Sequence, residues 1–194
     1  MSDELEVASG ALRRGHLVVL PTDTIYGVGA LPRSHGGVAG IFEAKGRPMD
    51  RPIPVLAANA EDLFDVVVFD ERARAVAAAL WPGPLSLVLP RQPDWPYDLG
   101  GGQETIAVRV TRNEVARGLL ERTGPLAVTS ANRSGEAPAV SVAEARAALG
   151  DRVAVYLDGG PCSEAPSSVV SLVGELQLLR EGSVSLEQIQ SVIE

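Results

Sequence analysis

The segment 45–51, which reads KGRPMDR, gathers cations at a spacing that suits a polyphosphate. Lys45 is the single lysine of a chain with 17 basic residues, and Arg47 and Arg51 follow it closely. A compact ammonium group and planar guanidinium groups together match the oxygens of a phosphate chain. A chance position of the one lysine is the alternative interpretation.

A second polar cluster follows the apolar run of the segment 17–29, LVVLPTDTIYGVG. The run is suited to a buried strand, and it leads directly into Thr22, Asp23, Thr24 and Tyr26. In α/β folds, ligands gather at strand ends, so the hydroxyl groups mark a candidate binding segment. A surface turn is the ordinary alternative.

Two more polar features come directly after expected strands. They are the segment 129–135, TSANRSG, and Arg109 at the end of TIAVR. Taken singly, each favours an ordinary structural explanation, because Ser, Asn and Gly form turns and an arginine often makes an ion pair. Their shared position at strand ends is what indicates a common site.

The elements that must position these residues follow from apolar periodicity, which alternates between the helical and the strand period. Strands are expected at 16–20, 53–58, 85–90, 105–110, 125–129, 153–157, 167–172 and 176–180. Helices are expected at 3–14, 35–45, 70–79, 113–123, 142–149 and from 185 onward. Capping boxes are predicted at Asp3 with Glu6, Ser141 with Glu144 and Ser185 with Gln188. This order predicts one α/β (α+β mixed) domain over 1–194, with helices on both faces of a mixed sheet.

Composition excludes several classes of protein. The 194 residues are 45% hydrophobic, which suffices for one core, and no apolar run is long enough to span a membrane. The polar, acidic start is unlike a secretory signal, so a cytoplasmic protein is expected. Cys162 alone forms no internal disulfide and, with two distant histidines, no structural metal site. The net charge of -8 argues against a globally basic nucleic-acid binder.

The motifs PTDTIYGVG, KGRP, PGPLS, AVRV, TSANRSG and LDGG occur here in an order typical of YrdC-like threonylcarbamoyl-AMP synthases. The resemblance covers about residues 5–183 and implies a three-layer fold with a twisted mixed sheet. The family's hallmark pairs a Lys-x-Arg with a Ser-x-Asn, which here are Lys45 with Arg47 and Ser130 with Asn132.

This resemblance implies a nucleotidyltransferase that condenses L-threonine, bicarbonate or CO2, and ATP. The products are threonylcarbamoyl-AMP and pyrophosphate, with Mg²⁺ accompanying the nucleotide. A downstream threonylcarbamoyl transferase complex then modifies tRNA, so this chain need not contact tRNA itself, and no membrane partner is implied.

The resemblance also implies roles for individual residues. It gives catalytic roles to Lys45 and Arg47. ATP contacts fall on Lys45, Arg47, Arg51, Thr105, Ser130, Asn132 and Arg180, and L-threonine contacts on Thr24, Tyr26, Arg109 and Ser167. No protein-held metal ion is expected.

Some positions depart from the family pattern. Leu56 stands where many members have a threonine-contacting histidine, and Ser86 replaces a threonine. Pro138 replaces a nucleotide-contacting serine, and the segment 163–168, SEAPSS, is irregular. The length resembles that of the short, single-domain members.

Two other functions stay open on the sequence alone. One is a double-stranded RNA-binding module, which the acidic pI of about 4.8 argues against. The other is a paralogous nucleotide-dependent enzyme with a different acceptor, which the leucine at position 56 keeps open.

Overall fold

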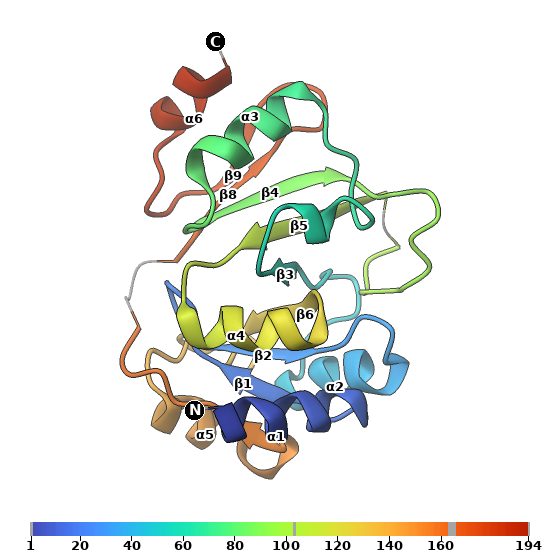
Figure 1. Cartoon of the computed structure of the whole chain (residues 1–194), viewed down its shortest axis with the longest axis vertical. Coiled ribbons are helices and arrows are strands. Elements are labelled where there is room, and N and C mark those ends of the chain that lie inside the picture. The colour runs from blue at the N-terminus through green and yellow to red at the C-terminus, as the bar shows by residue number, and fades with distance from the viewer. Residues whose placement is uncertain (1, 103, 163–165, 194) are drawn as a thin grey trace.

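The computed structural model describes residues 2–102, 104–162 and 166–193, and their strands join in one mixed sheet (Figure 1). The sheet has nine strands in the order β7-β1-β2-β6-β3-β5-β4-β8-β9. They are β1 (Val18–Leu20), β2 (Gly27–Ala30), β3 (Val55–Ala57), β4 (Leu85–Pro90), β5 (Thr105–Val110), β6 (Leu126–Ser130), β7 (Val155–Tyr156), β8 (Ser168–Ser171) and β9 (Gln177–Arg180). The pairs β1–β7, β3–β5 and β4–β8 are parallel, and the other neighbouring pairs are antiparallel.

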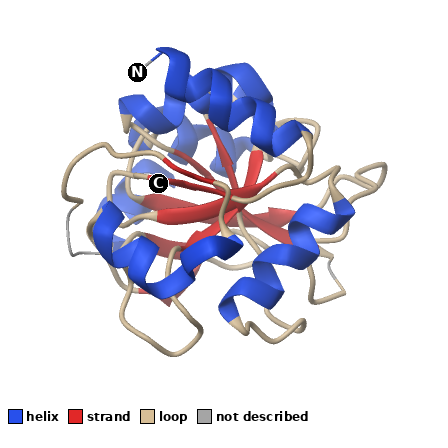
Figure 2. Cartoon of the chain, turned by 90° about the horizontal axis from the view of Figure 1, so that it is seen from below, coloured by secondary structure: helices blue, strands red, loops and turns tan. Residues whose placement is uncertain are grey.

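Helices cover both faces of this sheet, as Figure 2 shows. They are α1 (Ser2–Arg13), α2 (His35–Lys45), α3 (Glu71–Leu80), α4 (Glu114–Thr123), α5 (Val142–Leu149) and α6 (Leu186–Ile193), with short 3₁₀ helices η1 (Glu61–Leu63) and η2 (Gly150–Arg152). The expected mixed α/β architecture with helices on both faces is confirmed. Among the described residues, no helix combines the length and the apolar content needed to cross a membrane.

The two faces of the sheet build separate cores, because successive strand side chains point in opposite directions. In β1, Val18 and Leu20 pack with α1 and α4, whereas Val19 packs with α2 and α5. In β3, Leu56 likewise faces α1 and α4 while Val55 faces the other core. The alternation explains why these short strands are apolar throughout: both faces are covered.

The predicted caps are only partly right. Ser185 and Gln188 form a complete capping box, each accepting from the other's backbone N–H at 3.2 and 2.9 Å. Ser141 accepts from the N–H of Glu144, whose carboxylate accepts from the residue before Ser141. The box at Asp3 is wrong, because α1 already begins at Ser2 and Asp3 lies inside the helix.

Two strands differ from the sequence prediction. The sequence did not predict β2, whose glycines lack the β-branched side chains that mark strands, although it pairs with β1 and β6. The strand expected at 153–157 shrinks to β7. The first part of the irregular segment SEAPSS, residues 163–165, lies outside the described residues.

Candidate active site

A polar pocket of about 270 Å³ opens among the central strands of the sheet. Its walls come from the loop between β1 and β2 and from strands β3 to β6, β8 and β9. Of the residues expected to bind ligands, Thr24, Tyr26, Arg47, Arg109, Ser130, Ser167 and Arg180 line it. The structure therefore brings together residues that lie far apart in the sequence.

Lys45 is not among the residues that line this pocket, but it contacts Ser130, the last residue of β6, which is. Its ammonium group donates to the backbone carbonyl oxygens of Ser130 and Asn132, each at 2.5 Å. The side-chain oxygens of the same two residues lie 3.5 and 3.4 Å from Nζ. The predicted meeting of the Lys-x-Arg and Ser-x-Asn motifs thus occurs in the fold.

Local structure explains this geometry. Lys45 ends α2, and Gly46 caps the helix in the left-handed region, at φ 61°, so the chain turns sharply before Arg47. Glycine adopts this conformation without the steric penalty of a Cβ atom. The backbone carbonyl of Lys45 also accepts from the N–H of Ser134, which attaches the helix end to the TSANRSG segment.

The lysine is buried, with 2% of its surface exposed, and no carboxylate contacts its ammonium group among the described residues. Burial, followed by repulsion from Arg47, lowers the pKa of Lys45 to about 8. The group is therefore still a cation at neutral pH. Its charge is offset only by carbonyl dipoles, which favours an incoming anion.

Arg47 is held by the loop that follows it. Its guanidinium donates to the carbonyl oxygens of Arg51 and Pro52, both at 3.0 Å. Burial and the charge of Arg51 lower the pKa of Arg47, against the opposing effect of Asp50. Arg51 itself is exposed and does not line the pocket, so its described contribution is a backbone acceptor.

The other end of the pocket is organised around Arg109 on β5. Its Nη1 donates to the hydroxyl of Thr24 at 3.1 Å, and its Nε donates to the carbonyl of Gly83 at 3.0 Å. Its Nη2 lies 2.7 Å from Asp23, a buried charge pair. Asp23 also accepts from the hydroxyl of Thr111 at 2.6 Å.

Arg109 lines the pocket, but its Nη2 is buried against Asp23. The approach of Nη2 to Asp23 is not an aligned hydrogen bond, and Nη2 has no other acceptor among the described residues. A guanidinium in the wall of a pocket is suited to a carboxylate. Leu56 pairs with Arg109 in the strand register and gives this end an apolar wall.

Ser167 and Arg180 close the third side of the pocket. Arg180 donates to the carbonyl and the hydroxyl of Ser167 at 2.9 and 2.8 Å, and the hydroxyl of Ser86 lies 3.4 Å from that of Ser167. Burial and then the nearby charge of Arg109 lower the pKa of Arg180. Arg180 thus adds positive charge to the pocket, whereas the charge of Arg109 is balanced by Asp23.

Tyr26 forms part of the wall, but its hydroxyl is engaged elsewhere. The buried hydroxyl donates to the carbonyl of Gly160 at 2.7 Å and accepts from the N–H of Gly159 at 3.2 Å. Burial raises the pKa of this phenol, so it stays neutral. These two hydrogen bonds hold the LDGG segment, residues 157–160, against Tyr26.

The remaining predicted residues lie around this centre. Asn132 donates to the carbonyl oxygens of Arg133 and Glu136 at 2.8 Å each, which shapes the loop beside Lys45. Thr105 pairs with Pro90 at the start of β5 and is not among the residues that line the pocket.

Sequence reasoning missed two residues that organise the arginine end. Asp23 stood in the hydroxyl-rich segment without an assigned role, and only the β2 hairpin reveals that it faces Arg109. Gly83 acts through its backbone carbonyl, for which no side-chain signal exists.

The pocket offers no protein site for a metal ion. Its lining includes no aspartate or glutamate, and the nearby Asp23 is already engaged by Arg109 and Thr111. Over the described ranges, no group of three or more histidine, cysteine, aspartate or glutamate residues is placed to hold one.

Fold and pocket together define a class: a mixed α/β domain whose central sheet encloses a cationic, hydroxyl-lined pocket for small anionic ligands. Comparison with known proteins makes this class specific. The family model of Sua5, YciO and YrdC, described as telomere recombination, matches residues 10–182. The chain belongs to this family.

Similar proteins carry a consistent description. A putative threonylcarbamoyl-AMP synthase of Mycobacterium tuberculosis is 44% identical over 189 residues, 96% of this chain and 87% of the relative. The threonylcarbamoyl-AMP synthase of Bacillus subtilis is 36% identical over 195 residues, 98% of this chain and 56% of the relative. The solved structure of Pyrococcus abyssi Sua5 complexed with L-threonine superposes with a TM-score of 0.94 at 37% identity, covering 100% of this chain and 58% of that one.

Proposed function

We propose that this chain is a threonylcarbamoyl-AMP synthase, which condenses L-threonine, bicarbonate or CO2, and ATP to threonylcarbamoyl-AMP and pyrophosphate. The descriptions of its relatives and the threonine complex of Pyrococcus abyssi Sua5 support this function. The observation that carries it is the pairing of Lys45 with Ser130 and Asn132 at one end of a pocket whose other end is Arg109 with Thr24.

The two ends divide the substrates. We assign the triphosphate to the cationic end at Lys45 and Arg47, with Ser130, Asn132, Arg180, Arg51 and Thr105 as further nucleotide contacts. We assign threonine to the other end, where Arg109 takes its carboxylate and Thr24, Tyr26 and Ser167 complete the walls. A guanidinium that lines the pocket beside a neighbouring hydroxyl supports this assignment.

The reaction needs alignment rather than a nucleophilic side chain. The threonine amine adds to CO2 released from bicarbonate, and the amine proton combines with the released hydroxide to give water. A carbamate oxygen then attacks the α-phosphorus, the bond to the β-phosphate oxygen breaks, and pyrophosphate leaves. Holding the reactants together supplies roughly 7 to 11 kcal/mol in favourable cases.

The protein's own residues act on charge and water. Lys45 and Arg47 stabilise the negative charge that develops on the phosphates, each charge-assisted contact contributing about 1.5 to 3 kcal/mol. Enclosure of the pocket protects the labile carbamate from water. Because the pocket has no carboxylate ligands, Mg²⁺ enters as part of the substrate, held by the phosphates of ATP.

We further propose that 1–194 acts as a single catalytic domain in the cytoplasm and passes its product to a threonylcarbamoyl transferase complex, without gripping tRNA itself. The placement of the cationic groups supports this proposal, since Arg109 lines the pocket and both Lys45 and Arg109 are buried rather than spread over a surface. A double-stranded RNA-binding module would need the opposite arrangement.

The deciding experiment measures pyrophosphate release from MgATP. Release should require both L-threonine and bicarbonate, and serine should support it poorly. Equal release with serine, or without any amino acid, would reject the threonine-specific synthase. That outcome would instead favour a paralogous enzyme with a different acceptor, for which the apolar Leu56 beside Arg109 is the structural basis.

A further inference from the structure

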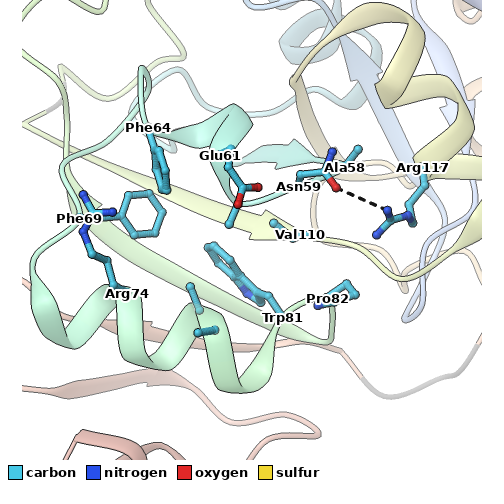
Figure 3. A pocket seen from close by; sticks show the side chains of 13 residues that line it. Ala58, Asn59, Glu61, Phe64, Phe69, Arg74, Trp81, Pro82, Val110 and Arg117 are labelled. Atoms are coloured by element: carbon cyan, nitrogen blue, oxygen red, sulfur yellow. Dashed lines mark hydrogen bonds between the residues drawn. The ribbon is translucent and has the colours of Figure 1, made fainter.

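A second cavity, of about 330 Å³, lies outside the proposed active site, between the end of β3, helix α3 and helix α4 (Figure 3). This volume falls within the range of sites for small molecules. One end is aromatic and the other is polar, and the synthase reaction uses neither. The cavity is therefore a candidate for a separate ligand.

The aromatic end consists of Phe64, Phe69 and Trp81, stacked edge to face. The ring centroids of Phe64 and Phe69 are 5.2 Å apart, and those of Phe69 and Trp81 are 6.2 Å apart. Phe64 is 37% exposed although it is a large apolar side chain. Such rings favour a flat apolar group that can join the edge-to-face arrangement. Arg74 is already placed over Phe64, at 5.0 Å.

The polar end presents one cation and one anion that do not pair with each other. Arg117 contacts Asn59 at 3.5 Å and Glu121 at 3.9 Å, both at the long limit of such interactions. Glu61, whose carboxylate lies between the rings and Asn59 in Figure 3, forms no ion pair with any described residue. A ligand with one negative and one positive group would satisfy both.

These features select one class of occupant. A phosphate-rich ligand would meet the carboxylate of Glu61, and a purely apolar one would give Glu61 no ion-pair partner and would leave Arg117 with only its long contacts. We propose that the cavity binds an α-amino acid with an aromatic side chain. Its ring would lie against Trp81 and Phe69, its carboxylate at Arg117 and its ammonium at Glu61.

The cavity is also connected to the proposed active site through one residue, Gly83. Gly83 follows the cavity residues Trp81 and Pro82. Its N–H donates to the carbonyl of Val110, a cavity residue, at 2.9 Å, and its carbonyl accepts from Arg109 of the active site at 3.0 Å. A ligand that holds this segment in place therefore favours the conformation in which Arg109 is positioned. Resting on the proposed function, this coupling predicts tighter threonine binding when the cavity is occupied.

Calorimetric titration of the full chain with L-phenylalanine, without ATP, tests the site. We expect saturable one-to-one binding that weakens by about tenfold in Arg117→Gln and in Glu61→Gln, the low end for a partly exposed charge-assisted contact. Arg122→Gln, an exposed cation on the same helix, is the matched control and should bind normally. The probes 3-phenylpropionate and 2-phenylethylamine, each lacking one charge, should bind about tenfold more weakly for the same reason.

Absence of phenylalanine binding would overturn the proposal. So would binding that both variants leave unchanged and that excess threonine displaces, because the ligand would then occupy the active site. A threonine titration at saturating phenylalanine tests the coupling, with about fivefold tighter binding expected. An unchanged or weaker threonine affinity would overturn the coupling. If threonine does not bind at all, the synthase proposal fails, while the phenylalanine result still decides the second site.

Discussion

A buried cation lies at each end of the central pocket, Arg109 in its lining and Lys45 in contact with the lining residue Ser130, and the charges of these two cations are compensated differently. Lys45 contacts the carbonyl dipoles of Ser130 and Asn132. Arg109, in contrast, lies 2.7 Å from the carboxylate of Asp23. One end therefore carries nearly its full positive charge, while the other holds a charge pair that is close to neutral.

This difference indicates which ligand each end accepts. An uncompensated cation in a low-dielectric pocket attracts a polyanion such as a triphosphate. A guanidinium balanced by a carboxylate is better suited to a zwitterion, because it recognises a carboxylate by geometry without excess positive charge. The predictions below separate these two modes, beginning with the largest effect.

Replacement of Lys45 by methionine should have the largest effect. Methionine fills the space but removes the charge at the phosphate end, so threonine-dependent pyrophosphate release should fall by roughly 100- to 1,000-fold. Arg33→Met, which removes an exposed cation, is the control and should keep its activity. A Lys45→Met variant with native circular dichroism and turnover within tenfold of the parent would contradict the assignment.

Replacement of Arg109 by methionine should weaken threonine binding by roughly 10- to 100-fold, from the loss of a charge-assisted contact. Nucleotide affinity, measured by calorimetry on the same protein, should change little. The variant also leaves Asp23 as an unpaired buried charge, which costs about 3 to 5 kcal/mol of folding stability. Arg109→Lys is the control for stability, because it keeps a positive charge beside Asp23. A greater loss of nucleotide affinity than of threonine affinity would reverse the proposed map.

The pH dependence of nucleotide binding should report on Lys45. Because its pKa is lowered to about 8, the free protein loses this proton as the pH rises through that value. ATP prefers the charged form, so its dissociation constant should rise about tenfold per pH unit above 8. Bound phosphate stabilises the ammonium group and shifts its pKa upward. Lys45→Met should lack this dependence, and an equal dependence in that variant would assign it to another group.

The smallest effect is expected for Thr24→Val, which keeps the shape of the side chain but removes the hydroxyl beside Arg109. One neutral hydrogen bond contributes about 0.5 to 1.5 kcal/mol, so the dissociation constant for threonine should rise roughly two- to tenfold. ATP binding should not respond. An unchanged threonine affinity would show that Thr24 supports the loop rather than the ligand.

Much of the fold could be predicted from the sequence, because most of its signals are local. The bounds of α2, α5, β4 and β5 agree with the predicted ranges. The capping box at Ser185 also needs only neighbouring residues. The strand β2 escaped prediction because its sequence, GVGA, has neither alternation nor β-branched enrichment, and only pairing on both sides defines it.

The contact of Lys45 with Ser130 and Asn132 was predictable, because the motifs that hold these residues carry a recognisable side-chain chemistry. The site was not predictable where the backbone or a distant partner sets the contact. Gly83 contributes a carbonyl group, and Asp23 acquires its role only when β2 brings the loop against β5. Thr105, which was predicted to contact the nucleotide, lies outside the pocket lining because the strand register pairs it with Pro90, and no sequence motif specifies that register.

Gly46 has a left-handed backbone conformation, at φ 61°, and this turn separates Lys45 at the end of α2 from Arg47. A Cβ atom added at Gly46 would meet no heavy atom within 4 Å, so space is not what excludes a larger residue. The cost of an L residue there is therefore conformational, and replacement of Gly46 by alanine should lower the melting temperature of the protein.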